Sequence, residues 1–258
     1  MKNIKKYIQS QKGTIPLIIS VPHGGTVKIK GIPMRKHGIR GIDKATIRLG
    51  KDLVKNIEER YQAKKLDSKI PYYIFSKVHR TQIDFNRNPN KAYRDNSNIA
   101  QQIYSLYHET LKKYILESIE HFGQTTLIDI HGFESNKRPK GFRDVDIVLG
   151  TNNLKSIYSH ERPKKRNWDN NIRGRIIETI QELGVPIAPS LSRRREYVLK
   201  GGYITQNYGA SEFKKSQAIQ IEFSERIRLD FQGNLRKNVL SRLTGLLVEE
   251  ISDKWREN

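Results

Sequence analysis

Short runs of apolar residues alternate along this chain with longer segments in which apolar residues recur at every third or fourth position. The short runs are typical of strands buried on both faces, whereas the longer spacing is typical of helices. The predicted strands cover residues 15–21, 71–75, 127–132, 145–149 and 218–223, and the predicted helices cover residues 44–61, 98–121, 168–183 and 234–255. Strands that alternate with long helices predict an α/β fold in which helices cover both faces of a sheet.

Three of the predicted strands carry side chains that bind metals or exchange protons. Asp129 and His131 stand two positions apart, so both project to the same side of their strand. His23 follows directly after another strand, and Glu222 lies within a third apolar run, where an unpaired carboxylate would be costly. Because open α/β sheets collect ligands at strand ends, these side chains are expected to form one site. The alternative is that each is an ordinary polar residue, hydrogen-bonded at a strand end.

Loops between the predicted elements add more polar and charged side chains to this set. They are Asp43, Arg80, Asp84, Asn86 and Arg87. Two histidines and a carboxylate have the composition of a zinc site that leaves a fourth position open, and an additional glutamate can serve as a general base. Arginines in a dry cleft neutralise a developing oxyanion and bind a substrate carboxylate at two points. The combination predicts metal-assisted hydrolysis of an amide.

The absence of cysteine narrows the chemistry of any metal site. The chain of 258 residues contains none, which excludes a disulfide framework, a thiolate zinc site and a cysteine nucleophile. No linker rich in proline, serine or glycine divides the sequence, so one domain over residues 1–258 is expected. The basic N-terminus is not followed by a long apolar segment, and no run reaches membrane-spanning length, so a cytoplasmic protein is expected.

Positive charge is the most unusual feature of the composition, with 48 basic and 27 acidic residues and a net charge of +21. Such a surface attracts polyanions, and the densest basic runs are residues 162–166 and 193–195. The alternative is that these runs are solvated faces, since no zinc finger or aromatic RNA-binding motif accompanies them. Weak electrostatic binding of nucleic acid therefore stays open. A second class of function also stays open, in which the protein binds polyanions on a hydrolase fold and has little or no turnover. Hydrolysis is favoured, because such a binder has no reason to retain the complete set of chemistry-bearing residues.

Motifs spread from about residue 16 to about residue 224 resemble those of the N-formylglutamate amidohydrolase family, and more distantly those of zinc carboxypeptidases and aspartoacylase-like hydrolases. The motifs are Ser20-Val21-Pro22-His23-Gly24-Gly25, the region of Asp43, Asp84-Phe85-Asn86-Arg87, Tyr107-His108, Asp129-Ile130-His131, Gly201-Gly202-Tyr203-Ile204-Thr205-Gln206-Asn207-Tyr208-Gly209 and Ala218-Ile219-Gln220-Ile221-Glu222. The resemblance implies a zinc-dependent hydrolase with a phosphorylase/hydrolase-like, zinc carboxypeptidase-like fold, in which three α/β/α layers surround a central mixed sheet.

The resemblance also implies a set of metal ligands. His23 and His131 resemble the two zinc-binding histidines of the family. Asp43 occupies the place of an acidic residue found in formylglutamate-hydrolase-like members, which makes it the expected third ligand, and the alternative is that it only caps a helix. Asp129 resembles the neighbour that steadies the second histidine, and Asp84 is expected to support the ligands from behind.

Catalytic and substrate-binding roles are implied in the same way. Glu222 resembles the glutamate that activates the attacking water, and Arg80 resembles the arginine that polarises the scissile carbonyl. Asn86 and Arg87 resemble the pair that binds the free carboxylate of the substrate. Tyr203, in the glycine-rich motif, is expected to join them in binding the substrate.

Departures from the family's pattern leave the substrate open. Carboxypeptidase-like members place a glutamate three residues after the first histidine, where this chain has Thr26. After the Asp-x-His motif the family commonly has serine, where this chain has Gly132, and residues 151–200 are unusually basic. The expected substrate is a small carboxylate-bearing anion, such as N-formylglutamate, another N-acyl amino acid, an acidic peptide or a cell-wall fragment.

Overall fold

A computed structural model describes residues 4–64, 69–137, 144–160, 162–197, 199–230 and 233–256. The strands within these ranges are β1 (Ile8–Gln11), β2 (Ile15–Val21), β3 (Pro71–Ser76), β4 (Thr125–Gly132), β5 (Ile147–Gly150), β6 (Ile187–Ala188) and β7 (Ser216–Phe223). The α-helices are α1 (Thr46–Ala63), α2 (Pro89–Ala92), α3 (Asn98–Phe122), α4 (Ile172–Glu182), α5 (Tyr203–Tyr208), α6 (Glu225–Arg228) and α7 (Asn234–Arg256). Short 3-10 helices are η1 (Ile4–Tyr7), η2 (Ser135–Lys137) and η3 (Lys165–Asn170).

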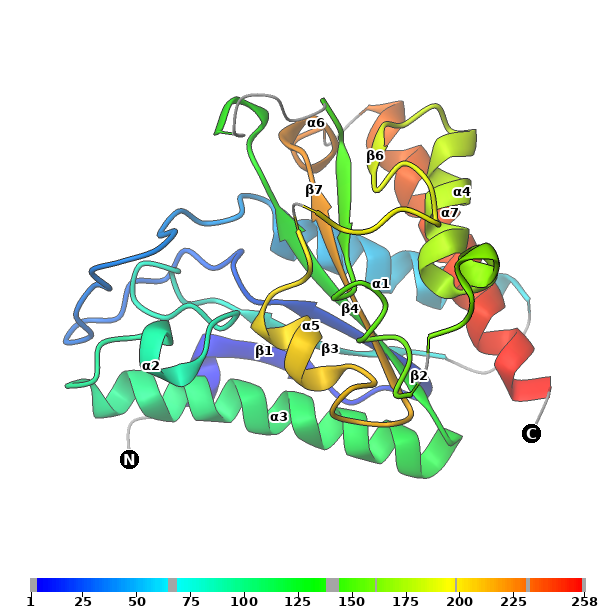
Figure 1. Ribbon diagram of the computed structural model, residues 1–258. Coiled ribbons are helices and arrows are strands. Elements are labelled where there is room, and N and C mark those ends of the chain that lie inside the picture. The colour runs from blue at the N-terminus through cyan, green and yellow to red at the C-terminus, as the bar shows by residue number, and fades with distance from the viewer. Residues whose placement is uncertain are drawn as a thin grey trace.

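The strands form a mixed sheet in the order β1-β3-β2-β4-β7-β5-β6 (Figure 1). Strands β3, β2, β4 and β7 run parallel to one another, whereas β1 is antiparallel to β3 and β5 is antiparallel to β7. The carboxyl ends of the four parallel strands therefore lie at the same edge of the sheet. The mixed sheet that the resemblance implied is confirmed.

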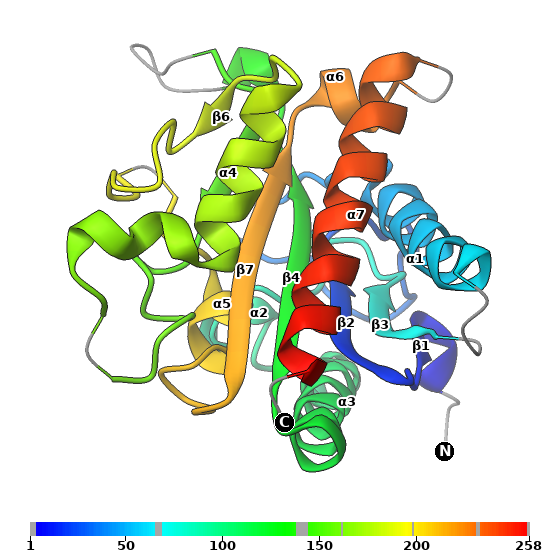
Figure 2. The same cartoon turned by 90° about the vertical axis from the view of Figure 1, so that its right-hand side faces the viewer.

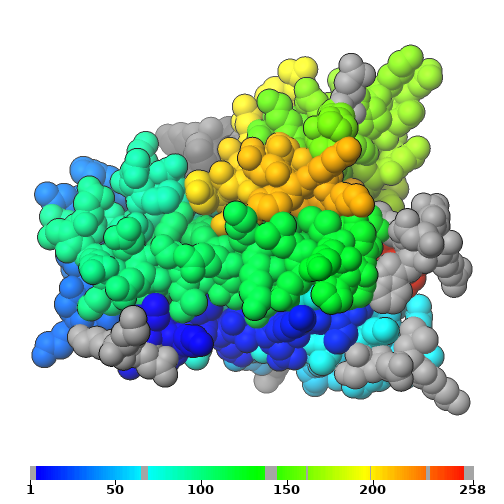
Figure 3. Space-filling view, turned by 90° about the horizontal axis from the view of Figure 1, so that it is seen from below, coloured from blue at the N-terminus to red at the C-terminus, as the bar shows by residue number. Residues whose placement is uncertain are grey.

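Helices cover both faces of this sheet, so the three α/β/α layers are confirmed as well. One face packs against α1, α4 and α7 (Figure 2) through a core that includes Ile19, Ile128 and Ile219. The other face packs against α3, which crosses the view in Figure 3, through a core that includes Ile18 and Leu127. Neighbouring residues of one strand belong to opposite cores because side chains alternate along a strand.

Alternation and register together place the polar side chains of the strands. Ser20 on β2 lies beside Asp129 on β4, which lies beside Gln220 on β7. Two residues further toward the carboxyl edge, His131 lies beside Glu222. All five belong to the face that packs against α3, since their apolar neighbours in each strand face the opposite core. The fold thus gathers the predicted strand residues on one face, at one edge.

The predicted elements correspond to β2, β3, β4, β5 and β7 and to α1, α3, α4 and α7. The helix predicted over 168–183 is divided, because η3 ends at Asn170 and α4 begins only after Asn171, whose side chain accepts a hydrogen bond from the Gly174 amide. The remaining strands and α-helices, of two to six residues, are too short to show a period in the sequence. Within the described ranges, no helix combines the length and apolarity needed to cross a membrane.

Candidate metal and catalytic site

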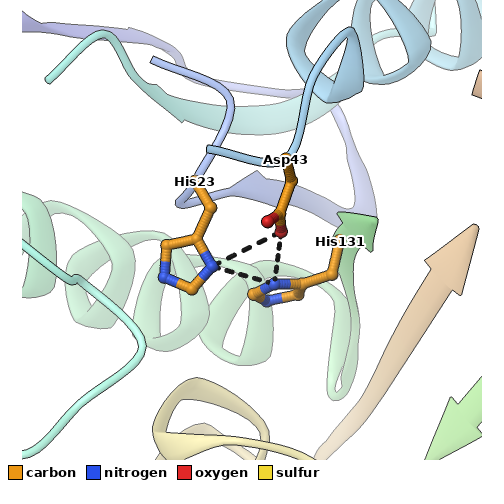
Figure 4. A group of neighbouring side chains, drawn as sticks. All are labelled: His23, Asp43 and His131. Carbon is orange, nitrogen blue, oxygen red and sulfur yellow. Dashed lines mark hydrogen bonds and ion pairs between the residues drawn. The ribbon is translucent and has the colours of Figure 1, made fainter. Parts of the chain in front are cut away.

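Three side chains that can ligate a metal meet at the carboxyl edge of the sheet (Figure 4). His23 follows β2, His131 lies near the end of β4, and Asp43 lies in the loop that precedes α1. The Nδ1 atoms of the two histidines are 3.1 Å apart. Asp43 Oδ2 lies 3.2 Å from His131 Nδ1 and 3.5 Å from His23 Nδ1. The structure thus brings together the three residues predicted to bind a metal, and all three are buried.

The outer nitrogens of the two imidazole rings show that this group suits a cation. His23 Nε2 lies 2.6 Å from Asp84 Oδ1, and His131 Nε2 lies 2.9 Å from Asp129 Oδ2. A carboxylate only accepts hydrogen bonds, so each Nε2 carries the proton and each Nδ1 of a neutral ring presents a lone pair to the centre. Two lone pairs and a carboxylate oxygen therefore converge on one point. Nitrogen and oxygen donors in this combination fit zinc or a similar divalent metal.

The electrostatics of the group favour positive charge at its centre. Burial opposes ionisation of Asp43, but hydrogen bonds and charge from the two histidines outweigh it and hold the pKa of this carboxyl well below its usual range. Burial likewise opposes a charged His131, yet Asp129 and Asp43 raise its pKa well above the ordinary value. The buried acids therefore hold a positive charge in the site, which a proton or a metal ion can supply.

Backbone hydrogen bonds hold Asp43 in place, and its carboxylate lies beside the two histidines. Its amide donates a hydrogen bond to the His23 carbonyl oxygen over 3.0 Å, and the Gly132 amide donates to its Oδ2 over 3.2 Å. Helix α1 begins at Thr46, and its N-cap is Ala45, with no side-chain capping bond. The alternative that Asp43 only caps this helix is therefore wrong, because the carboxylate points away from the helix end and toward the two imidazoles.

Glu222 lies at the edge of the candidate metal group. Its Oε1 is 4.0 Å from His131 Nδ1 and accepts a hydrogen bond from Gln220 Nε2 over 2.8 Å. Burial raises the pKa of Glu222, His131 partly offsets this effect, and the charge of Asp43 adds to it. A carboxylate with a raised pKa is a stronger base than an ordinary carboxylate, which is a property that suits a general base.

Three arginine side chains surround Oδ2 of Asp84, the carboxylate oxygen that does not contact His23. Arg80 Nε lies 3.1 Å from Asp84 Oδ2, Arg35 Nη1 lies 3.3 Å away and Arg87 Nε lies 3.5 Å away. Burial would raise the pKa of Asp84, but His23 and the arginines hold it well below its usual range. Arg80 also approaches the candidate ligand Asp43, with 3.5 Å between Nη1 and Oδ1. The side chain of Arg87 is 40% exposed, so part of this positive charge is open to a ligand.

Asn86 lies where the start of α5 approaches the site. Asn86 Oδ1 accepts a hydrogen bond from the Ile204 amide over 2.7 Å, and its Nδ2 donates to Gln220 Oε1 over 3.5 Å. A Cβ atom on Gly202 would lie 2.2 Å from Asn86 Nδ2, so glycine is what allows this close approach. The side chain of Asn86 is thus occupied by protein groups, and its role in binding a carboxylate stays a prediction. The same holds for Tyr203, the first residue of α5.

Arg35 and Arg228 were missed by reasoning from sequence. Arg228 is buried, and its guanidinium donates to the Phe223 carbonyl over 2.9 Å and to the Phe133 carbonyl over 2.8 Å, and also contacts the Lys44 carbonyl. It therefore ties together the ends of β4 and β7 and the loop that holds the candidate ligand Asp43. Neither arginine lies in a strand or in a long helix, so no periodic signal marked them.

A histidine-aspartate-histidine group beside a glutamate and several arginines is typical of metal-dependent hydrolases. The family can be stated more closely, because a model described as N-formylglutamate amidohydrolase matches residues 93–228, more than half of the chain. The chain belongs to the N-formylglutamate amidohydrolase family. A search of curated proteins finds no match.

Solved structures show the same fold. An N-formylglutamate amidohydrolase from Ralstonia eutropha JMP134 is 15% identical, with a TM-score of 0.64, and the match covers 97% of this chain and 99% of that chain. A gene product from Agrobacterium tumefaciens is 12% identical, with a TM-score of 0.62, over 100% of this chain and 98% of that chain. A metallo-carboxypeptidase from Pseudomonas aeruginosa is less similar, at 9% identity and a TM-score of 0.46 over 92% of this chain and 57% of that chain.

Proposed function

We propose that this protein is a zinc-dependent amidohydrolase that cleaves an amide bond in a small carboxylate-bearing substrate, such as N-formylglutamate, another N-acyl amino acid or an acidic peptide. The observation that carries the proposal is the convergence of His23 Nδ1, His131 Nδ1 and Asp43 Oδ2, with the carboxylate of Glu222 4.0 Å from one of them. Membership in an amidohydrolase family supports the class of bond.

The metal would be held by these two imidazoles and the aspartate. When bound, zinc supplies a Lewis acid that polarises a carbonyl oxygen and makes water more acidic. Asp84 and Asp129 fix the orientation of the two rings through their outer nitrogens, which keeps both Nδ1 lone pairs aimed at one point.

Glu222 moves the proton in this proposal. Its carboxylate takes a proton from the attacking water as the new carbon–oxygen bond forms, and returns it to the amine nitrogen as the carbon–nitrogen bond breaks. The raised pKa of Glu222 suits both steps, because a carboxylate with a lower pKa would be too weak a base to accept the proton. Gln220 orients the carboxylate through its hydrogen bond to Oε1.

The arginines supply positive charge at two places. Arg80, beside Asp43, neutralises the negative charge that develops on the carbonyl oxygen of the substrate. Arg87 binds the free carboxylate of the substrate, because its guanidinium is the more exposed one and presents two parallel donors.

The test combines a measurement of zinc content with hydrolysis assays on a set of amide substrates. Purified protein should contain about one zinc per chain and should hydrolyse N-acyl amino acids. Glu222→Gln should lower kcat by about a thousandfold while zinc content stays the same, because the amide keeps the shape but cannot accept the proton. Glu212→Gln, which makes the same change at an exposed position, should leave turnover intact. Turnover that survives in Glu222→Gln would remove this residue from the mechanism, and a metal-free protein with full activity would overturn the proposal.

A further inference from the structure

A cavity away from the candidate metal site is lined by positive and aromatic side chains. Its volume is about 710 Å³, within the range of pockets that bind small ligands. The side chains that give it its character are Lys155, Tyr158, His160, Arg162, Trp168 and Arg195. None of the described side chains that line it is acidic. We refer to this cavity as the cationic pocket.

The two basic runs of the sequence converge on the cationic pocket. Arg162 comes from the first run and Arg195 from the second, more than thirty residues later. The buried Arg173 of α4 joins the two segments, because it donates to the Ser192 carbonyl over 3.0 Å and its guanidinium lies 5.8 Å from the ring of Trp168. Runs that are separate in the sequence thus form a single positive surface.

The cationic pocket is distinct from the metal site. The chain between β5 and α5, green to yellow in Figure 2, lies along the flank of the molecule opposite β1. The candidate metal ligands lie instead after β2, on β4 and in the loop before α1, and none of them lines the pocket. The inference therefore does not rest on the proposed hydrolase activity.

Much of the positive charge in the cationic pocket is not neutralised by the protein. Nearby Arg173 and Arg193 are paired with acids, at 3.1 Å from Glu196 and 3.0 Å from Asp169. Lys155 and Arg195 have no acidic partner within the described part of the chain, and Arg162 donates to a backbone carbonyl.

An exposed aromatic side chain follows the second run. Tyr197, two residues after Arg195, is 81% exposed, which makes it the most exposed of the large apolar side chains among the described residues. Single-stranded nucleic acids bind surfaces that combine cations for the phosphates with exposed aromatic rings on which bases stack. An acidic peptide would use the cations but has no need of the ring.

We propose that the cationic pocket binds the phosphate backbone of a single-stranded nucleic acid, with a base stacked on Tyr197. The phosphates contact Lys155, Arg162 and Arg195. Binding releases the counterions that were condensed on the nucleic acid, so the affinity falls as the salt concentration rises. Trp168 and Tyr158 form the apolar wall of the pocket.

The experiment uses fluorescein-labelled oligonucleotides of about ten nucleotides, one of deoxythymidine and one of uridine, and a fluorescein-labelled glutamate peptide of about ten residues. Binding to the full chain is followed by anisotropy between about 50 and 200 mM salt. Lys155→Gln/Arg195→Gln should weaken oligonucleotide binding at least tenfold. Lys51→Gln/Lys112→Gln removes the same charge from exposed positions on α1 and α3 and should change binding less than twofold. The two oligonucleotides distinguish DNA from RNA as the favoured strand.

Tyr197→Ala should weaken oligonucleotide binding about fivefold or more without changing the salt slope, since stacking involves no counterions. The single variants Lys155→Gln and Arg195→Gln should each give part of the loss, which keeps the test open if the double variant does not fold. Equal losses in the pocket and control pairs would overturn the proposal in favour of general charge attraction. Absence of binding at about 150 mM salt, or tighter binding of the glutamate peptide through the same two residues, would also overturn it.

Discussion

His23 and His131 turn the same ring atom, Nδ1, toward each other at 3.1 Å, while their Nε2 atoms point to separate buried carboxylates. Two lone pairs at this distance repel each other unless a positive charge lies between them or beside them. The carboxylates behind the rings prevent either imidazole from rotating its Nε2 proton into the gap. The geometry of the pair therefore favours a shared cation, and in the absence of a metal ion protonation of an imidazole relieves the repulsion.

The first prediction concerns metal and stability. Zinc at about one hundred times its dissociation constant should stabilise the fold by about 2.7 kcal/mol, which raises the melting temperature by several degrees. A strong chelator should reverse the shift. His131→Ala should abolish the zinc-dependent shift because one of the two shared donors is lost, and Asp43→Asn should weaken zinc binding.

Two comparisons make this prediction specific. His121→Ala removes an exposed histidine of α3 and should keep the full zinc-dependent shift. If Asp43→Asn binds zinc as tightly as the wild type, the aspartate is not a ligand and only the histidine pair stands. Differential scanning fluorimetry with zinc titration measures all four proteins.

The second prediction concerns recognition of the substrate carboxylate. Arg87→Lys should lower kcat/KM for a carboxylate-bearing amide at least tenfold, because an ammonium group cannot form the two parallel bonds of a guanidinium. The loss for the matching neutral amide should be less than about threefold. Arg166→Lys, an exposed arginine of η3, is the control for a change of arginine to lysine. Equal losses on the two amides would show that Arg87 does not recognise the carboxylate.

The third prediction uses the close contact between Gly132 and Arg228. A Cβ atom on Gly132 would lie 2.2 Å from Arg228 Nε and 2.5 Å from its Cδ. Gly132→Ser should therefore displace the buried guanidinium and destabilise the fold by about 1–3 kcal/mol. It should also weaken metal binding, since Arg228 holds the Phe133 and Lys44 carbonyls next to two of the ligands.

A double-mutant cycle separates this contact from a general effect of serine. Arg228→Ala removes the atoms that clash, so the loss caused by Gly132→Ser should be smaller in that background. Gly41→Ser adds a side chain where no atom lies within 4 Å and should cost little. Additive losses in the cycle would show that the two residues are not coupled. Urea unfolding gives the free energies.

The strand residues of the site could be predicted because two simple rules place them. Side chains two apart in a strand share a face, and parallel strands end at one edge, so Asp129, His131, His23 and Glu222 had to meet if the sheet was parallel at that point. The structure shows that the strands carrying them, β2, β4 and β7, are neighbours.

The loop residues of the site were harder to predict, because their position depends on contacts between distant parts of the chain. Asp43 was open to two interpretations, since the sequence does not show that α1 begins at Thr46, after Ala45 with a φ of 63°. Arg35 meets Asp84 only because the loop after β2 folds back over the segment that follows β3. The antiparallel placement of β5 beside β7 likewise follows from packing and not from any local pattern.

The last prediction concerns pH and rests on His108, which lies in α3 outside the metal group. Its Nδ1 is 2.9 Å from the hydroxyl of Tyr208. Burial lowers the pKa of His108 to about 4, and the Phe85 backbone and the charge of Asp129 only partly oppose this effect. In the unfolded chain the imidazole returns to its ordinary pKa near 6.5. Between these values the unfolded state binds more protons than the folded state, so the free energy of unfolding falls as pH falls.

The contribution of His108 is complete above pH 6.5 and is lost progressively as the pH falls toward 4. At pH 5 the wild type should have lost about 2 kcal/mol through this residue, and little at pH 7. The glutamine in His108→Gln keeps a polar group near Tyr208 but cannot be protonated. Between pH 7 and pH 5 the unfolding free energy of this variant should therefore fall by about 2 kcal/mol less than that of the wild type. His121→Gln, at an exposed position of the same helix, should keep the wild-type slope. Urea unfolding at the two pH values measures the difference, and parallel slopes for wild type and His108→Gln would show that His108 titrates normally in the folded protein.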